Sequence, residues 1–234
     1  MRTVLAVGHR GDPYHARENT LPAIASALEH GADAVEVDVR LTSDGVPVLL
    51  HDASLQRLWG HDSFLAALTA KEVRALTGGE LPTLAEALAA ARATRLMIDL
   101  PGATEEAVRA VVGAVREGGA AERVYYTAGA TAMLAVRAAD PAAEIAMTWT
   151  TLAPPRPALL AAVRPKWLNY RFGLVSQELA AAVHGEGLLV SAWTADTRRS
   201  MRWLIRNGVD SITTNRVGVL AALTDARRPS RADR

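Results

Sequence analysis

Short apolar runs rich in β-branched residues recur eight times along the chain, separated by Ala- and Leu-rich segments with helical spacing. We expect strands near residues 3–8, 34–40, 95–99, 123–127, 144–149, 167–171, 188–193 and 211–215. Helices are expected in the intervening segments, for example near residues 20–30, 83–93, 104–118, 129–139, 176–184 and 196–207. Because eight strands alternate with helices, the sequence predicts a parallel (β/α)8 barrel of the TIM type.

A doubly wound open sheet is the alternative fold. That fold normally carries a Gly-rich phosphate loop after its first strand, whereas Gly8-His9-Arg10-Gly11 follows the first strand here. The 234 residues are enough for one barrel domain, which we assign to residues 1–224. We expect the basic tail, residues 225–234, to be disordered.

One interval is irregular, the insertion of residues 42–81 between the second and third barrel strands. It contains a predicted turn at residues 43–45, a short strand at 47–50 and a small helix at 70–76. Thr69 is the expected cap of that helix, with Glu72 at its third position. Such an insertion usually forms part of the mouth around a barrel's active site.

Composition excludes several classes of protein. The formal net charge is +1, so no broad field attracts nucleic acid or an anionic membrane. Because the chain has no cysteine, it has no disulfide, and oxygen or nitrogen atoms must hold any metal. Its N-terminus turns polar too soon for a signal peptide or membrane span. We therefore expect a cytoplasmic protein. Its oligomeric state is left open between a monomer and a homodimer.

Two carboxylates mark the second strand. Glu36 and Asp38 lie two residues apart in the run Ala34 to Val39, so alternation sends both side chains to one face. Their Cα atoms are then roughly 7 Å apart, within reach of one cation. An edge strand with a solvated polar face is the alternative, but the flanking Ala and Val residues favour a metal site over it.

Other polar residues stand where predicted strands end, the face that carries the chemistry of such barrels. His9 ends the first strand and His51 the hairpin after the second, a placement that suits a general acid and base pair. Arg10 either binds a phosphate as a bidentate fork or forms an ordinary ion pair at the rim. The remaining histidines, His15, His30, His61 and His184, are expected at the surface or at helix ends.

An ordered set of motifs carries a family resemblance. It comprises His9-Arg10-Gly11, Glu18-Asn19-Thr20, Glu36-Val37-Asp38-Val39, Thr42 to Val48 and His51-Asp52, followed by Pro82 to Leu88, Ala192-Trp193-Thr194 and Gly208 to Asn215. Together they resemble the glycerophosphodiester phosphodiesterase family over residues 8 to 215. The resemblance implies a TIM-type barrel that hydrolyses glycerophosphodiesters to glycerol 3-phosphate and an alcohol with one divalent cation, Mg²⁺ or Ca²⁺.

The resemblance also implies roles for single residues. Glu36 and Asp38 would be metal ligands, and His9 and His51 the acid and base. Glu18 would be a polar anchor near the metal, or would only fix its own loop. Trp193 would line the pocket mouth against the substrate, with a buried core position as the alternative.

The third strand departs from the family pattern. The family usually has Glu-x-Lys where this chain has Asp99-Leu100-Pro101. Asp99 is a competent third metal ligand, but Pro101 removes a cation that would face the phosphate. Arg171, at the end of the sixth predicted strand, is our candidate for the missing charge; the alternative is a rim arginine that faces Glu178 or solvent. The segment 126–129 departs from the family as well, which leaves substrate choice open.

Two other functions stay open on this scaffold. The first is lysophospholipase D-like or cyclising phosphodiester chemistry, which an apolar groove at the mouth would favour. Candidate residues to line such a groove are Trp149, Leu152 and Phe172. A non-catalytic barrel that binds a phosphorylated ligand is suggested by Pro101. Both histidines and all three carboxyl positions are present, which favours an enzyme.

Overall fold

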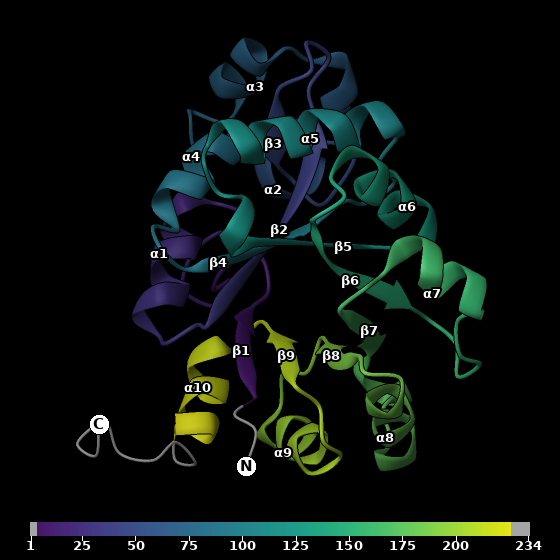
Figure 1. Ribbon diagram of the computed structural model, residues 1–234. Coiled ribbons are helices and arrows are strands. Elements are labelled where there is room, and N and C mark those ends of the chain that lie inside the picture. The colour runs from purple at the N-terminus through teal and green to yellow at the C-terminus, as the bar shows by residue number, and fades with distance from the viewer. Residues whose placement is uncertain (1–3, 226–234) are drawn as a thin grey trace.

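The computed structural model describes residues 4–225, and the predicted barrel is confirmed (Figure 1). Eight parallel strands pair in a closed ring, because β1 pairs with both β2 and β9. The ring strands are β1 (Leu5–Gly8), β2 (Ala34–Leu41), β4 (Arg95–Asp99), β5 (Val124–Ala128), β6 (Glu144–Trp149), β7 (Trp167–Arg171), β8 (Leu189–Trp193) and β9 (Ser211–Thr214). Strand β3 (Pro47–Leu49) lies outside the ring and pairs antiparallel with β2.

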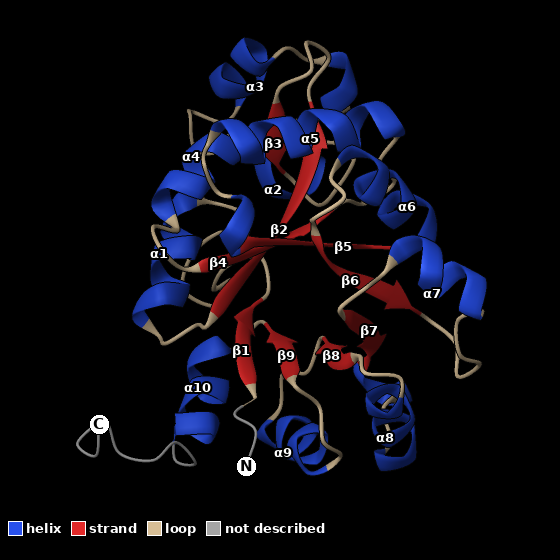
Figure 2. Ribbon diagram, viewed as in Figure 1, coloured by secondary structure: helices blue, strands red, loops and turns tan. Residues whose placement is uncertain are grey.

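Helices surround the ring (Figure 2). They are α1 (Leu21–Glu29), α4 (Leu84–Ala90), α5 (Glu105–Glu117), α6 (Ala130–Ala139), α7 (Pro157–Val163), α8 (Gln177–Gly185), α9 (Arg198–Arg206) and α10 (Val217–Asp225). The helical segments named from the sequence do not include α7 and α10. Helix α7 has seven residues, like α3 (Ala70–Leu76) and α4, but lacks the capping side chain that marks those two, and α10 is apolar on nearly every side. No helix within residues 4–225 is long and apolar enough to cross a membrane.

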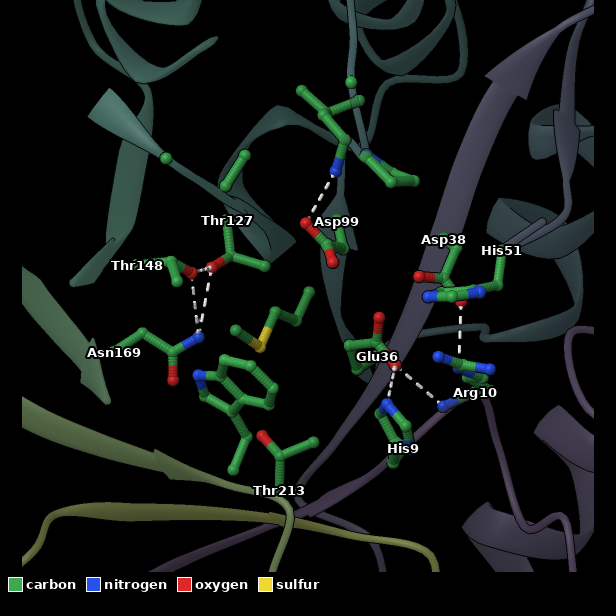
Figure 3. Close-up of a pocket in the computed structure, with 17 residues that line it drawn as sticks. His9, Arg10, Glu36, Asp38, His51, Asp99, Thr127, Thr148, Asn169 and Thr213 are labelled. Atoms are coloured by element: carbon green, nitrogen blue, oxygen red, sulfur yellow. Dashed lines mark hydrogen bonds and ion pairs between the residues drawn. The ribbon is translucent and has the colours of Figure 1, made fainter. Parts of the chain in front are cut away.

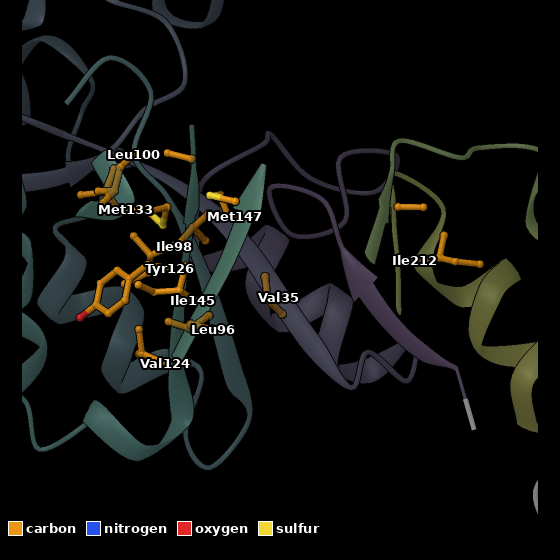
Figure 4. Packing of buried hydrophobic residues seen from close by; sticks show 14 of the residues in the cluster. Val35, Leu96, Ile98, Leu100, Val124, Tyr126, Met133, Ile145, Met147 and Ile212 are labelled. Carbon is orange, nitrogen blue, oxygen red and sulfur yellow. The ribbon is translucent and has the colours of Figure 1, made fainter. Parts of the chain in front are cut away.

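The main core fills the space between the strands and the helices. Residues such as Val35, Ile98 and Ile145 alternate along their strands with inward-facing residues and point outward into this layer (Figure 4). Each is fully buried, which stabilises the fold by about 1.5–3 kcal/mol per side chain of this size. The β-branched and aliphatic runs that identify the strands in the sequence are therefore the inner wall of this core.

A second apolar cluster fills the amino-terminal half of the barrel interior. It contains Val7, Ala34, Met97, Tyr125, Ala146 and Trp167. At that end Glu144 accepts hydrogen bonds from Arg95 at 2.7 Å, Lys166 at 2.9 Å and the Trp167 indole at 2.9 Å. The amino-terminal half of the barrel interior is therefore filled, and the cavity described below opens at the carboxyl ends of the strands.

The insertion folds on a small core of its own. Strand β3, α2 (Gln56–Trp59) and α3 (Ala70–Leu76) enclose the buried residues Val48, Leu50, Leu55, Leu65, Val73 and Leu81. The predicted capping box is confirmed, since Thr69 and Glu72 bond each other's backbone N–H. The backbone N–H of Leu50 donates to the carbonyl of Asp38 at 3.0 Å. This bond holds the following residue, His51, at the barrel mouth.

The predicted disordered tail, residues 225–234, lies outside the described residues except for Asp225, the last residue of α10. The domain boundary at residue 224 therefore stays a prediction.

We predict that Glu144→Gln destabilises the protein by roughly 1–3 kcal/mol, because Arg95 and Lys166 lose the half-buried carboxylate that they share. Turnover should not change, since the cluster lies at the opposite end of the barrel from the cavity. Urea unfolding measures the loss. Glu105→Gln, which removes an exposed helical ion pair, is the control and should have no measurable effect. Equal stability of the two variants would contradict a stabilising role of the Glu144 carboxylate.

Candidate active site

A cavity of about 330 Å³ opens at the carboxyl ends of the barrel strands (Figure 3). All eight ring strands or the residues directly after them contribute to it. Its lining comprises His9, Arg10, Glu36, Asp38, His51, Met97, Asp99, Leu100, Pro101, Gly102, Thr127, Ala128, Gly129, Thr148, Asn169, Trp193 and Thr213. Of the nine site residues expected from the sequence, all but Glu18 and Arg171 lie in this lining.

The three expected metal ligands come together. Glu36 and Asp38 point to the barrel interior from alternate positions of β2, and Asp38 is paired in register with Asp99 of β4. Each of the three residues offers a carboxylate oxygen, and these oxygens lie within 4.8 Å of one another. The backbone alternation and the strand register together create this cluster, as the sequence pattern indicated.

The electrostatics of the cluster fit a cation. Burial, followed by the charges of Asp38 and Asp99, raises the pKa of Glu36 well above its ordinary value. Burial and the charge of Asp38 raise the pKa of Asp99 to about 7. The three carboxylates, when ionised, carry more negative charge than the single positive charge of the nearby Arg10 can neutralise. An all-oxygen donor set of this kind suits a hard divalent cation such as Mg²⁺ or Ca²⁺.

Arg10 joins the first strand to the carboxylates. Its backbone has φ 55°, in the left-handed region, and its N–H donates to Glu36 at 2.8 Å. Its guanidinium Nε lies 3.1 Å from Asp38 Oδ2. The sharp turn requires glycine on both sides, since a Cβ on Gly8 or Gly11 would lie 2.6 Å from a backbone atom.

Glu18 lies behind this loop and not in the cavity lining. Its Oε1 accepts from Arg10 at 2.8 Å and from Arg57 of the insertion at 2.6 Å. Although burial opposes it, the hydrogen bonds from Arg57 and Arg10 lower the pKa of Glu18. Two roles were predicted for Glu18, a polar anchor near the metal or a residue that fixes its loop. The contacts support the second role, because Glu18 links the loop of Arg10 to the insertion.

Asn19 is a site residue to which sequence reasoning gave no role. Its side chain donates to Asp38 Oδ2 at 2.8 Å and accepts from the Asp38 backbone N–H at 3.1 Å. Its φ of 56° is one that Asn tolerates better than most residues. The quoted motif Glu18-Asn19-Thr20 contained the signal, but only the fold brings Asn19 beside Asp38.

His9 is held in one orientation by a chain of hydrogen bonds. Asn215 donates from Nδ2 and its backbone N–H to Asp196, at 2.8 and 2.9 Å. Its Oδ1 is left to accept from His9 Nδ1 at 2.8 Å. His9 Nε2 then faces the cluster, 3.9 Å from Glu36 Oε2. Burial lowers the pKa of His9 and so favours the neutral imidazole, although the hydrogen bond that His9 donates to Asn215 opposes this shift.

His51 has an equivalent anchor on its own Nδ1. That nitrogen donates to Asp52 Oδ1 at 2.7 Å, and Asp52 Oδ2 accepts from Arg57. The hydrogen bond from Arg57, supported by that from His51, lowers the pKa of Asp52 to about 2. With Nδ1 occupied, Nε2 is the ring atom that remains for chemistry. His9 and His51 lie on different sides of the Glu36 and Asp38 carboxylates (Figure 3).

Two predicted substrate-binding residues lie toward the mouth. Trp193 lines the cavity, in agreement with the predicted pocket position. Arg171 is exposed at the carboxyl end of β7, paired in register with Trp193 but outside the cavity lining. No carboxylate among the described residues, Glu178 included, lies within ion-pair distance of Arg171. Pro101 does line the cavity, so that wall carries no cation.

The other four histidines lie outside the cavity, as expected. His15 and His30 stack on each other and contact the buried Asp12. His61 bonds the carbonyl of Leu76, and His184 contacts Asp210. Each of the four histidines therefore has a polar partner in the structure.

Comparison with known proteins agrees with this geometry. The sequence profile of the Glycerophosphoryl diester phosphodiesterase family matches residues 9–219. The chain belongs to this family. The predicted resemblance is thus confirmed, and with it the class of phosphoric diester hydrolases.

Relatives match over nearly the whole chain. A glycerophosphodiester phosphodiesterase of Caldanaerobacter subterraneus subsp. tengcongensis is 27% identical over 232 residues, which cover 90% of this chain and 93% of that protein. The crystal structure of a glycerophosphodiester phosphodiesterase from Thermotoga maritima is 25% identical, with a TM-score of 0.83 and coverage of 95% of this chain and 99% of that one.

A third match is a phosphodiesterase from Oleispira antarctica, solved in complex with the product sn-glycerol-3-phosphate. It has a TM-score of 0.86 at 21% identity, and the match covers 94% of this chain and 96% of that one. At this identity the likeness shows the shared fold alone.

We predict that the stability difference between the native protein and Asp52→Asn depends on pH. The folded pKa of Asp52 is about 2, below its ordinary value of 3.8, so its carboxylate stabilises the fold above pH 3.8. This contribution should be constant near pH 5, fall by about half at pH 3, and vanish below about pH 2. Urea unfolding between pH 5 and 3 measures it, with the exposed Asp62→Asn as control. A difference that does not change over this interval would contradict the assigned pair.

Proposed function

We propose that this protein hydrolyses glycerophosphodiesters to glycerol 3-phosphate and an alcohol, with one divalent cation as cofactor. One observation carries the proposal: three carboxylates that suit a hard cation share a cavity with two histidines that are each anchored through Nδ1. Family membership and the glycerol 3-phosphate bound by the Oleispira antarctica relative support the substrate class.

Glu36, Asp38 and Asp99 would hold the cation, Mg²⁺ or Ca²⁺. When bound, such a cation neutralises charge that develops on a phosphate oxygen. Asn19 orients Asp38 through two hydrogen bonds, and the Arg10 N–H orients Glu36. Arg10 lines the cavity beside Asp38, where its guanidinium can bind the phosphate of the substrate.

The two histidines move the protons. The Nε2 of one histidine accepts a proton from the nucleophile, and the other histidine donates a proton to the leaving alkoxide. Asn215 keeps His9 in the Nδ1–H form, and Asp52 does the same for His51. Two nucleophiles satisfy this chemistry: water, or the neighbouring hydroxyl of the glycerol moiety. The second route gives a cyclic phosphate first, which water then opens.

Arg171 is our candidate for the charge that Pro101 removes. It ends β7 two residues after Asn169, which lines the cavity, and strand alternation gives the two residues the same face. Because the side chain is exposed and unpaired among the described residues, it is available to an anionic substrate at the mouth.

Lysophospholipase D-like cleavage is the second candidate, favoured by an apolar groove beside the active site. The groove, of about 240 Å³, shares Pro101 and Gly102 with the cavity and continues along Phe64 and Leu65 of the insertion. It differs from the predicted place, since Trp149, Leu152 and Phe172 do not line it. An acyl chain longer than the cavity would fit this groove. The expected cytoplasmic location and the oligomeric state stay predictions.

The first experiment measures release of glycerol 3-phosphate from glycerophosphocholine and glycerophosphoethanolamine with Mg²⁺, Ca²⁺ or chelator. We expect cation-dependent release, lowered by at least roughly 10²-fold in Glu36→Gln, His9→Ala and His51→Ala. Glu29→Gln, a residue at the end of α1 away from the cavity, is the matched control for Glu36→Gln.

Lysophosphatidylcholine is assayed in parallel. Turnover of this lipid alone would replace the proposal by the lysophospholipase D-like function. If release of glycerol 3-phosphate is undiminished in chelator, the proposed cation dependence is wrong. Binding of glycerol 3-phosphate without turnover of any diester would indicate the non-catalytic barrel.

For Arg171→Ala we predict a loss of roughly 10²-fold in kcat/KM, the scale of removing one charge-stabilising group. Arg171→Lys should recover part of the loss. The control is Arg109→Ala, which removes an exposed arginine on α5. Unchanged turnover in Arg171→Ala would remove Arg171 from the mechanism.

A further inference from the structure

A second group of possible metal ligands lies outside the active-site cavity. Asp12, in the loop between β1 and α1, is close to His15 of the same loop and to His30 at the end of α1. Each of the three residues offers one ligand atom, and these atoms lie within 4.8 Å of one another. None of the three lines the active-site cavity. We call this group the Asp12 cluster.

Both imidazoles of the Asp12 cluster converge on a single oxygen. The Nδ1 atoms of His15 and His30 lie 2.8 and 3.0 Å from Asp12 Oδ2. The Ser26 hydroxyl donates to the same oxygen at 3.0 Å. His30 Nδ1 is also 2.9 Å from the Ser26 carbonyl oxygen, although this nitrogen carries at most one proton. Several short approaches therefore share few protons.

These distances are close to those between the ligands of a small cation. In a tetrahedral site with bonds of about 2.0–2.1 Å, neighbouring ligand atoms are roughly 3.3 Å apart. The observed separations of 2.8 and 3.0 Å need only a small widening to admit an ion. The two imidazole rings stack with their centroids 4.6 Å apart, so both approach Asp12 from neighbouring directions.

The cluster combines a buried anion with access from solvent. Asp12 is 2% exposed, whereas the side chains of His15 and His30 are 60% and 42% exposed. All three line a cleft of about 360 Å³ that also includes Tyr14 and Gly218. A buried carboxylate favours a positive partner. An ion reaches this carboxylate through the cleft, which has room for water as a further ligand.

One positive charge lies near the cluster and opposes a bound cation. Arg216 lines the same cleft, with its guanidinium carbon 5.0 Å from the centroid of the Tyr14 ring. Its side chain is exposed, so water and salt screen its charge. The repulsion is therefore weak beside the attraction of a buried carboxylate.

The ligand set selects the metal. Two imidazoles and one carboxylate suit Zn²⁺, whereas Mg²⁺ and Ca²⁺ prefer sites made only of oxygen, such as the carboxylate cluster of the cavity. Three protein ligands leave a fourth position for water. We propose that Asp12, His15 and His30 form a second metal site, which is selective for Zn²⁺ and separate from the cation site of the cavity.

A bound ion joins the loop after β1 to α1. The same loop carries Arg10 and Asn19, which contact the carboxylates of the cavity. The Asp12 backbone N–H already donates to the carbonyl of Ala23 in α1 at 3.0 Å. The ion adds a cross-link from the loop to His30 and stabilises the folded protein, because the unfolded chain does not hold the three ligands together. The site is independent of the proposed catalytic activity.

The test is calorimetric titration of the metal-free protein with Zn²⁺, carried out on Glu36→Gln to weaken binding in the cavity. We expect one Zn²⁺ per chain, with affinity lowered by at least roughly 10-fold when His15→Gln or His30→Gln is added. Mg²⁺ in excess should not displace this ion. The control is His61→Gln, which changes a histidine that bonds a backbone carbonyl outside the cluster.

Co²⁺ in place of Zn²⁺ reports the ligands directly, because it absorbs visible light more strongly in a four-coordinate site with imidazole than in an octahedral oxygen site. We expect the strong absorption in Glu36→Gln and its loss when either histidine is replaced. Thermal unfolding without metal shows whether each variant is folded. In the native protein, the same histidine substitutions should lower the number of bound Zn²⁺ ions by one per chain, which tests the site without the Glu36 change.

Absence of Zn²⁺ binding to Glu36→Gln and to the native protein would overturn the second site. Zn²⁺ affinity that is equal in the two histidine variants and in His61→Gln would overturn it as well. Weak Co²⁺ absorption that does not respond to either histidine would place the ion on other ligands and lead to the same conclusion.

Discussion

The clustering of three carboxylates, two of them buried and the third partly buried, is the constraint on which the rest of this barrel mouth depends. Glu36, Asp38 and Asp99 lie together because strand alternation and register leave them no other direction. Burial, and then the charges of the neighbouring carboxylates, raise the pKa of Glu36 and of Asp99, as expected of a cluster that favours a cationic partner. A cation is the simplest partner that lets all three ionise, and the surrounding structure is consistent with holding one.

The neighbouring residues act by keeping that cluster and the histidines in fixed positions. Arg10 reaches two carboxylates through a left-handed turn that only its flanking glycines permit. Asn215 and Asp52 each occupy one histidine Nδ1, so both imidazoles present the same nitrogen to the cavity. The insertion supplies His51 and, through Arg57 and Glu18, is tied to the loop that carries Arg10. The active-site geometry thus depends on contacts between segments distant in sequence.

Much of this could be predicted from the sequence. The alternating runs identified the eight strands, and the spacing of Glu36 and Asp38 placed two carboxylates on one face, because strand periodicity is a local property. The helical segments named from the sequence do not include α7, which lacks a capping side chain, or α10, which lacks a polar face. The partnership of Asn19 with Asp38 and the hydrogen bond between Thr127 and Thr148 depend on which elements become neighbours. Such contacts between elements leave no periodic trace in the chain.

The most direct test of the central claim is calorimetric titration of metal-free protein with Mg²⁺ and Ca²⁺. The account predicts one cation bound per chain, with affinity strongly reduced in Glu36→Gln and in Asp99→Asn, and unchanged in Asp62→Asn at the surface. Binding that is unaffected in both cavity variants, or no binding of either cation, would contradict the assignment of the three carboxylates as the metal site.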